Sequence, residues 1–193
     1  MTIRWGAAAR PKQGQEVSGD AYLVIEHNGS TLVAIIDGLG GGAEAARAAI
    51  GAVQTVESYV HRPLKEIMER CHTALHGTRG AVMGLLRLSP DSRHASYMGV
   101  GNTGIHVLSA QTIKPISRNG ILGHRQLPSL LELNYTYDHG DTFILYTDGI
   151  STRFMSDTGH IRRGDDPEAL AATLLKQYGK TSDDATVVVL TVD

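Results

Sequence analysis

The chain has 193 residues, with 18 Lys and Arg against 20 Asp and Glu, and 41% of them are hydrophobic. This length predicts one domain, residues 1–193, whose core needs no disulfide, and Cys71 has no internal partner for one. A net charge of −2 excludes the basic field that holds nucleic acid or an anionic membrane. No apolar run is long enough to span a bilayer or to act as a signal peptide, so we expect a cytoplasmic protein.

The first half of the chain predicts a hairpin followed by two helices. Residues 22–26 and 31–37 are β-rich and are joined by Asn28-Gly29, a strong hairpin signal. The alanine-rich segment 43–60 predicts a helix, with an apolar stripe that includes Ile50. A second amphipathic helix follows after a break at Pro63, with apolar positions at Leu64, Ile67, Met68, Cys71 and Leu75.

The second half of the chain predicts mostly strands. They are expected at 81–88, 92–100, 105–108, 131–137, 142–147 and 186–192, with a loop-rich stretch at 110–130. One late helix is expected from Asp166 to about Tyr178, with the Asp as cap and a Pro after it. Strands joined mostly as hairpins do not fit a parallel sheet, so the pattern favours an antiparallel sheet pair with helices packed outside.

Aspartates occur at four places where a predicted strand meets a turn: Asp20, Asp37, Asp148 and the pair Asp183-Asp184. Carboxylates at sheet ends converge in space, and Mg²⁺ and Mn²⁺ prefer such oxygen ligands. An Asp-Gly pair is also an ordinary turn dipeptide. The pattern by itself therefore leaves two alternatives, a divalent metal site and a set of plain turns.

The order of these motifs resembles a known family. The segments 18–21 (SGDA), 37–42 (DGLGGG), 101–102 (GN), 147–150 (TDGI) and 183–186 (DDAT) are similar to the metal-dependent serine/threonine phosphatases of type 2C, the PPM family. The resemblance covers residues 3–192 and is strongest to the compact bacterial branch with SpoIIE-type and RsbX-like domains. It implies an α+β fold, a four-layer α-β-β-α sandwich of two antiparallel sheets flanked by helices.

The resemblance also implies a metal centre. Asp37 matches the aspartate that bridges two Mn²⁺ or Mg²⁺ ions, and Gly38 matches the glycine whose carbonyl binds one of them. Asp148 and Asp183 match the carboxylates that bind the other ion. A water held between the cations would then attack the phosphorus atom in line, without a covalent intermediate.

Two more aspartates take supporting places in this resemblance. Asp20 matches an acidic residue that binds a metal-bound water, so Asp20 and Asp37 are the expected catalytic pair. Asp184 lies beside a ligand and is expected to support it, with at most a weak role toward the metal.

The chain departs from its larger relatives at three points. Gln15 stands where they carry the basic residue that holds the substrate phosphate, which Arg10 or Lys12 could replace. Asn102 stands where they carry an aspartate for a third metal, so two ions are expected and a third is doubtful. Only about 40 residues lie between the strand at 105–108 and Asp148, which implies no large flap subdomain and an open site suited to a folded protein substrate.

The implied function is a protein phosphatase acting on phosphoserine or phosphothreonine in a bacterial stress-signalling protein, with STAS-domain scaffold proteins of a stressosome-like complex as partners. One alternative is a catalytically inactive binding module of the same family. Another is a dinucleotide-binding oxidoreductase that uses the glycine-rich segment Gly38–Ala43. His72 and His76 have helical spacing, but Thr73 replaces the glutamate of a zinc-protease helix, so they are expected to be surface histidines.

Overall fold

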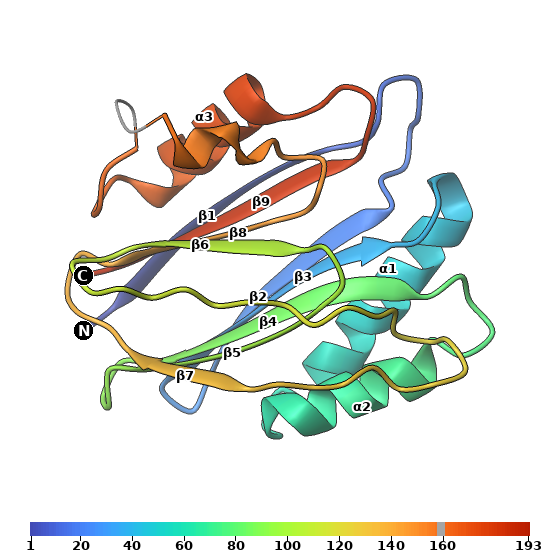
Figure 1. Ribbon diagram of the computed structural model, residues 1–193, viewed down its shortest axis with the longest axis horizontal. Coiled ribbons are helices and arrows are strands. Elements are labelled where there is room, and N and C mark those ends of the chain that lie inside the picture. Colours follow the sequence, from blue (N-terminus) through green and yellow to red (C-terminus); the bar gives the residue numbers. More distant parts are fainter. Residues whose placement is uncertain (158–160) are drawn as a thin grey trace.

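Two antiparallel sheets stack face to face in the computed structural model, which describes residues 1–157 and 161–193 (Figure 1). The four-stranded sheet has the order β1 (Ile3–Arg10), β9 (Ala185–Val192), β8 (Thr142–Tyr146) and β6 (Gly104–Leu108). The five-stranded sheet has the order β2 (Asp20–His27), β3 (Ser30–Gly38), β4 (Ala81–Ser89), β5 (His94–Val100) and β7 (Leu133–Thr136). The helices are α1 (Gly42–Ser58), α2 (Leu64–Ala74) and α3 (Pro167–Tyr178), with a short 3₁₀ turn, η1 (Thr152–Met155).

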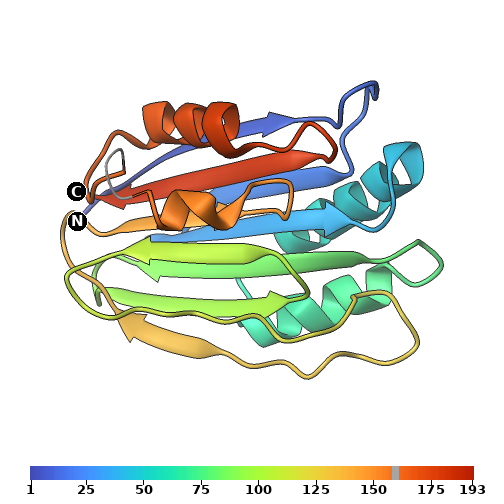
Figure 2. The same cartoon turned by 45° about the horizontal axis from the view of Figure 1, so that its top comes forward.

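The helices cover the outer faces of the two sheets, as Figure 2 shows from a tilted view. The helices α1 and α2 pack on the five-stranded sheet, and α3 with η1 packs on the four-stranded sheet. Strand β3 shows how the layers are built, because Val33 and Ile35 face the other sheet while Ala34 and Ile36 face the helices. The expected four-layer α-β-β-α sandwich is therefore confirmed.

The N-terminal strand β1 was not expected from the sequence. It pairs with β9 along its whole length, from Ile3 opposite Val192 to Arg10 opposite Ala185. Gly6 interrupts its β-pattern, and a side chain there would lie 2.7 Å from the carbonyl carbon of Pro167. The glycine thus lets the start of α3 lie against the strand, which is a requirement of packing that local propensity does not reveal.

Helix α1 buries only part of the apolar stripe that the sequence predicts. Ile50 is 54% exposed, whereas five alanines and Val56 form the buried face. Small side chains let the helix axis approach the sheet closely, so the alanines rather than the bulky isoleucine face the core. The stripe of α2 is confirmed, because all five of its predicted positions are buried.

The strands β5 and β6 do not form the hairpin that their short connection suggests. Gly101, with φ +89°, turns the chain out of the five-stranded sheet, and Gly104 begins a strand of the other sheet. The loop-rich stretch after β6 then returns across the end of the sheets. It is fixed there by a bridge between Ala81 and Leu122 and by the Gly123 N–H, which donates to Nδ1 of His72 at 3.2 Å.

His72 is consequently buried, and the expectation that it lies on the surface was wrong. It is 7% exposed, and its Nε2 lies 3.3 Å from Nε2 of His76 on the next turn of α2. The Gly123 N–H needs a lone pair on Nδ1, so the ring proton of the neutral form sits on Nε2. That tautomer joins the two histidines by a hydrogen bond and leaves Nε2 of His72 without a lone pair for a metal.

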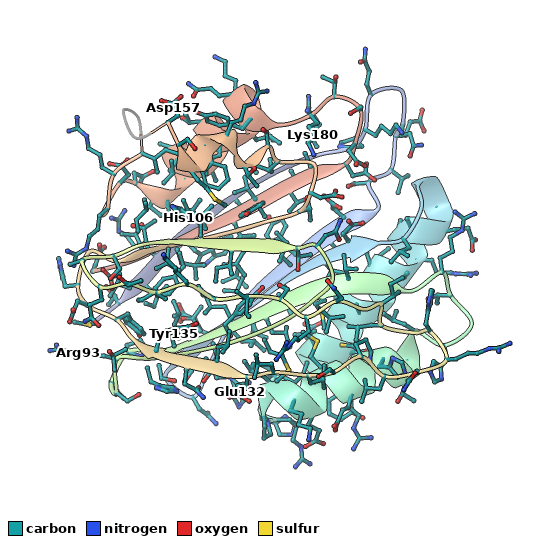
Figure 3. All side chains as sticks on the ribbon, in the orientation of Figure 1. Arg93, His106, Glu132, Tyr135, Asp157 and Lys180 are labelled. Atoms are coloured by element: carbon teal, nitrogen blue, oxygen red, sulfur yellow. The ribbon has the colours of Figure 1, made fainter. Side chains whose placement is uncertain are left out.

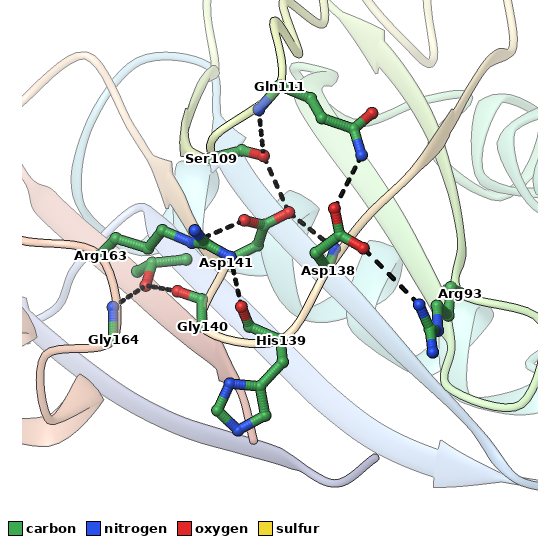
Figure 4. Close-up of polar contacts among 10 residues, drawn as sticks. Arg93, Ser109, Gln111, Asp138, His139, Gly140, Asp141, Arg163 and Gly164 are labelled. Carbon is green, nitrogen blue, oxygen red and sulfur yellow. Dashed lines mark hydrogen bonds and ion pairs between the residues drawn. The ribbon is translucent and has the colours of Figure 1, made fainter.

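The turn before β8 is anchored by a buried carboxylate, as Figure 4 shows. Asp141 is fully buried and accepts hydrogen bonds from the Ser109 hydroxyl and the Asp138 N–H, both at 2.9 Å. Nε of Arg163 lies 3.0 Å from its other oxygen. This network confirms the predicted turn at 138–141.

Among the described residues, no helix has the length and apolarity needed to cross a membrane.

Candidate metal centre

The pairing of the strands brings the aspartate motifs to one end of both sheets. Asp20 at the start of β2 lies directly opposite Asp37 near the end of β3. In the other sheet, Asp148 follows β8 and Asp183 precedes β9, and the Thr147 N–H donates to the Thr186 carbonyl at 3.0 Å between them. Four segments that are far apart in the sequence therefore meet where the two sheets end.

A cavity of about 640 Å³ opens at this end. Three of the predicted ligands line it, Asp37, Asp148 and Asp183, together with Asn102. Asp20, Gly38 and Asp184 are not among the residues that line it. The structure thus brings three of the predicted residues to the surface of the cavity and keeps the other three outside its lining.

The carboxylates around the cavity are held close enough to raise one another's pKa. Burial, followed by the charges of Asp20, Asp148 and Asp183, raises the pKa of Asp37 from its usual 3.8 to about 8. Burial and the charge of Asp183 also raise the pKa of Asp148. Such shifts mean that negative charge here lacks compensation, and a divalent cation would supply it.

Asp20 has a different environment. The Thr147 hydroxyl donates to its carboxylate at 2.6 Å, which ties β2 of one sheet to the end of β8 in the other. Burial is the main cause that raises the pKa of Asp20 to about 7, against the opposing effect of this hydrogen bond. Asp20 lies beside Asp37, and the resemblance implies that the acidic residue at this position binds a metal-bound water.

Asn102 contacts the centre directly. Its amide Nδ2 donates to Asp148 at 2.7 Å, and this hydrogen bond offsets part of the rise in the pKa of Asp148 that burial causes. The position at which the resemblance implies an aspartate for a third metal therefore carries a neutral donor that binds one oxygen of Asp148.

Asp184 is committed to the protein backbone. It is 7% exposed and accepts hydrogen bonds from the N–H groups of Lys12 and Gly19, both at 2.8 Å. It thereby fixes both ends of the loop between β1 and β2, and Gly19 in turn accepts a hydrogen bond from the Gly38 N–H at 3.0 Å. The carboxylate positions the loop that carries Asp20.

Replacing Asp184 with Ala should therefore release this loop. One buried and one partly buried N–H donor lose their charged acceptor, so we expect a loss of about 2 kcal/mol and a melting temperature lower by about 4–8 °C. Cleavage by trypsin after Lys12 should become faster. Asp91→Ala, in an exposed turn at the far end of β4, is the control, and equal melting temperatures for the two variants would contradict the assigned role.

The two Asp-Gly motifs depend on glycine for space. A side chain at Gly38 would lie 2.8 Å from the carbonyl carbon of Ala45 in α1, and one at Gly149 would lie 2.7 Å from the carbonyl carbon of Asp184. Neither glycine has a positive φ. These residues are needed because another segment of backbone passes close by, and they let both aspartates reach the end of the sheet.

The donor set fits a hard divalent cation that retains water. In the part of the chain that the structure describes, no three carboxylate, imidazole or thiolate groups converge tightly enough to enclose an ion by themselves. Mg²⁺ is usually held by only one or two direct carboxylates and keeps several waters. Three aspartates spread around one cavity satisfy that requirement, whereas a site for dehydrated Zn²⁺ would need closer convergence.

Sequence patterns did not reveal all parts of the cavity. Part of its lining is formed by Asn119, Gly120 and Ile121 from the loop-rich stretch, which carries no motif. The ammonium group of Lys180 donates a hydrogen bond to the Asp148 carbonyl at 2.5 Å. Figure 3 labels Lys180 in the region between α3 and β9. It follows Gly179 at the end of α3, and no local pattern connects it with Asp148.

Comparisons with known proteins agree with this architecture. The model of the family Stage II sporulation protein E (SpoIIE) matches residues 27–193. The phosphoserine phosphatase RsbX of Bacillus subtilis (strain 168) is 27% identical over 180 residues, which cover 92% of this chain and 88% of that protein.

Two solved structures are also similar. A chain from work on the bacterial stressosome, as a modular system adapted to control secondary messenger signaling, is 33% identical with a TM-score of 0.88, over 98% of this chain and 100% of that one. The crystal structure of RsbX in complex with magnesium is 24% identical with a TM-score of 0.86, over 99% and 96% of the two chains.

The fold is that of the type 2C phosphatases, and the curated relative that matches is a phosphoserine phosphatase. Within that class, the chain belongs to the SpoIIE family, because the family model covers most of its length.

Proposed function

We propose that the chain acts as a single catalytic domain, residues 1–193, and is a cytoplasmic protein phosphatase that depends on Mn²⁺ or Mg²⁺. It would hydrolyse phosphoserine or phosphothreonine in a stress-signalling protein. The observation that carries the proposal is the cavity at the end of the sheets, which Asp37, Asp148 and Asp183 line together.

The residues of the cavity would hold two cations. Asp37 is the candidate bridge, Gly38 offers its carbonyl, and Asp148 and Asp183 are the remaining ligands. Bound divalent cations would lower the pKa of water and neutralise the charge that develops on the phosphoryl oxygens. Asp20, held by the Thr147 hydroxyl, would orient water on the Asp37 side.

An amide at position 102 favours two cations over three. Asn102 adds no charge and already donates a hydrogen bond to Asp148. A cation at this side of the cavity would have to displace that donor and would gain no carboxylate from position 102.

The shape of the site supports a protein substrate. The cavity shares Gly120 and Ile121 with a second hollow of about 840 Å³, which the segment 120–129 lines. The loop therefore forms an open path beside the aspartates and can accept the chain around a phosphorylated residue. Similarity to RsbX and to a chain solved in stressosome work supports phosphorylated STAS-domain scaffold proteins as the substrates.

Phosphate release from a phosphoserine STAS-domain protein tests the proposal. With Mn²⁺ or Mg²⁺ we expect turnover, because the cations supply the positive charge that the cavity lacks. Excess EDTA should abolish turnover, and added Mn²⁺ should restore it. Loss of the phosphate is followed by intact mass spectrometry of the substrate, and p-nitrophenyl phosphate serves as a substrate without protein contacts.

The assay also decides between the alternatives. Binding of the phosphoprotein without metal-dependent turnover would establish the inactive binding module instead. The dinucleotide alternative has little structural support, because α1 and α2 follow each other through residues 42–74, all described, where a dinucleotide fold would place a second strand.

A further inference from the structure

A phosphoryl dianion has to approach three aspartates in the candidate cavity, so a fixed positive charge beside it would favour binding. The nearby cations Lys180 and Arg10 are already engaged. The ammonium of Lys180 donates to the Asp148 carbonyl at 2.5 Å, and Arg10 donates to the Lys180 carbonyl at 2.8 Å. Gln15, which lies against Gly41 and Gly42, is neutral.

Arg79 lies at the rim of the cavity, in the turn between α2 and β4. The turn is tied to the end of β3, because the Leu39 N–H donates to the Gly80 carbonyl at 2.9 Å. The Arg79 side chain lies over Gly40, where Cδ and Cζ of the arginine would each be 3.3 Å from a β-carbon at that position. Gly40 and Leu39 both line the cavity.

The same turn also contacts another part of the cavity lining. A side chain at Gly80 would lie 2.8 Å from Cγ2 of Ile121, which also lines the cavity. Arg79 thus belongs to a turn that contacts two residues of the cavity lining, Leu39 and Ile121. It is exposed, and among the described residues its guanidinium makes no ion pair, so its donors are available to a ligand.

We propose that Arg79 binds the phosphoryl group of the substrate at the rim of the cavity, where its guanidinium reaches two phosphoryl oxygens. A planar guanidinium matches two oxygens of a phosphate with parallel N–H donors. Glycine at position 40 leaves the space in which the guanidinium lies. This inference rests on the proposed phosphatase function for the identity of the substrate, but the phosphate site itself does not require turnover.

Two measurements on the full chain loaded with Mg²⁺ test this site. One is the KM and kcat for a phosphoserine peptide, and the other is the Kd for inorganic phosphate by calorimetry. In Arg79→Gln we expect both KM and Kd to rise about 10- to 100-fold, with kcat within about 3-fold of the wild type, because charge-assisted hydrogen bonds to the ground-state phosphate are lost. Arg79→Lys should restore part of the affinity.

Arg70→Gln is the matched control. Arg70 is an exposed arginine of α2 that pairs with Glu66 and lies over the Tyr59 ring, so its loss changes the charge equally and should leave KM and Kd unchanged. Unchanged KM and Kd in Arg79→Gln would overturn the inference. If that variant does not fold, as judged by circular dichroism, a wild-type Kd in Arg79→Lys overturns it.

Failure of the two proposals can be distinguished. If the wild type binds phosphate through Arg79 but releases none from any phosphoprotein, the proposed enzyme function fails and the phosphate site stands. If the wild type turns over substrate with a KM that does not depend on Arg79, the function stands and the site is wrong. A wild type that binds no phosphate overturns the site.

Discussion

Asp37→Asn should reduce metal-dependent turnover by at least about 10³-fold, equivalent to about 4 kcal/mol of transition-state stabilisation. Asn keeps the size of the side chain but removes the charge of the proposed bridge between two cations. Steady-state phosphate release with Mn²⁺, measured beside Mn²⁺ affinity by calorimetry, checks this. Asp91→Asn has the same change of charge in an exposed turn and should match the wild type.

The same substitution should stabilise the protein when no divalent cation is present. The pKa of Asp37 is raised to about 8 in the folded state, so the folded protein holds a proton that the unfolded chain releases above about pH 4. The free energy of unfolding therefore falls as pH rises from about 4 to about 8. Asn cannot ionise, so the variant does not lose this stability as the pH rises.

In EDTA at pH 8 we expect Asp37→Asn to melt at least about 2–4 °C higher than the wild type, which corresponds to about 1 kcal/mol. The difference should shrink at pH 5 and reverse when Mn²⁺ is added, because the cations bind the wild type more tightly than the variant. If Asp37→Asn keeps its turnover, Asp37 does not bridge the cations. If the variant melts below the wild type in EDTA at pH 8, the charge of Asp37 is already compensated in the folded protein.

Gly149→Ala is expected to have the largest effect on folding. The added methyl group would lie within 3 Å of the backbone of both Asp184 and Ala185. Neither the turn that holds Gly149 nor the start of β9 can move without disturbing the pairing between β8 and β9. We expect a loss of about 3 kcal/mol and a melting temperature lower by about 6–12 °C, measured by calorimetry with EDTA present.

Gly51→Ala provides the comparison for this prediction. Gly51 lies in α1, and its added methyl group would make only an ordinary contact, 3.6 Å from a methyl of Leu75. Ala is the better helix former by up to about 1 kcal/mol, so this variant should melt at or slightly above the wild-type temperature. If both variants melt alike, the close backbone approach at Gly149 is absent in solution.

Local sequence signals predicted those elements whose structure is decided locally. The Asn28-Gly29 turn has φ values of +47° and +75°, as a tight hairpin requires, and the strands on both sides pair with each other. Asp166 caps α3 by accepting the Ala169 N–H at 3.0 Å. In each case a residue's own conformational preference coincides with its place in the fold.

Local sequence patterns failed to predict the structure where it depends on a segment that is distant in the sequence. The strand β1 forms because β9 is available to it, and Gly6 is tolerated because α3 needs the space. Ile50 is exposed because the face of α1 that packs on the sheet is formed mainly by alanines. His72 is buried because a loop 51 positions later covers it. None of these partners can be identified from residues nearby in the sequence.

The candidate site could be predicted only in part for the same reason. The aspartates carry a recognisable motif because each sits at a strand end, and the strand pairing then brings them together. Arg79 and the wall at 119–121 carry no motif, because their roles depend on loops that meet only in the folded chain. The predicted ligand set remains a prediction that the variants above test.

The pairing of β1 with β9 has a consequence for the order of folding. Arg4 and Asp193 are 189 positions apart and form an ion pair, and Figure 1 shows both chain ends at the same end of the molecule. During synthesis β1 is made before the other strands of this sheet and its neighbour β9 is made after them, and β9 also separates β1 from β8. The four-stranded sheet is therefore completed only after translation has passed residue 192, and contacts between such distant segments slow folding. Until then the five-stranded sheet with α1 and α2, all encoded before residue 137, exposes the face that later forms the interior of the sandwich.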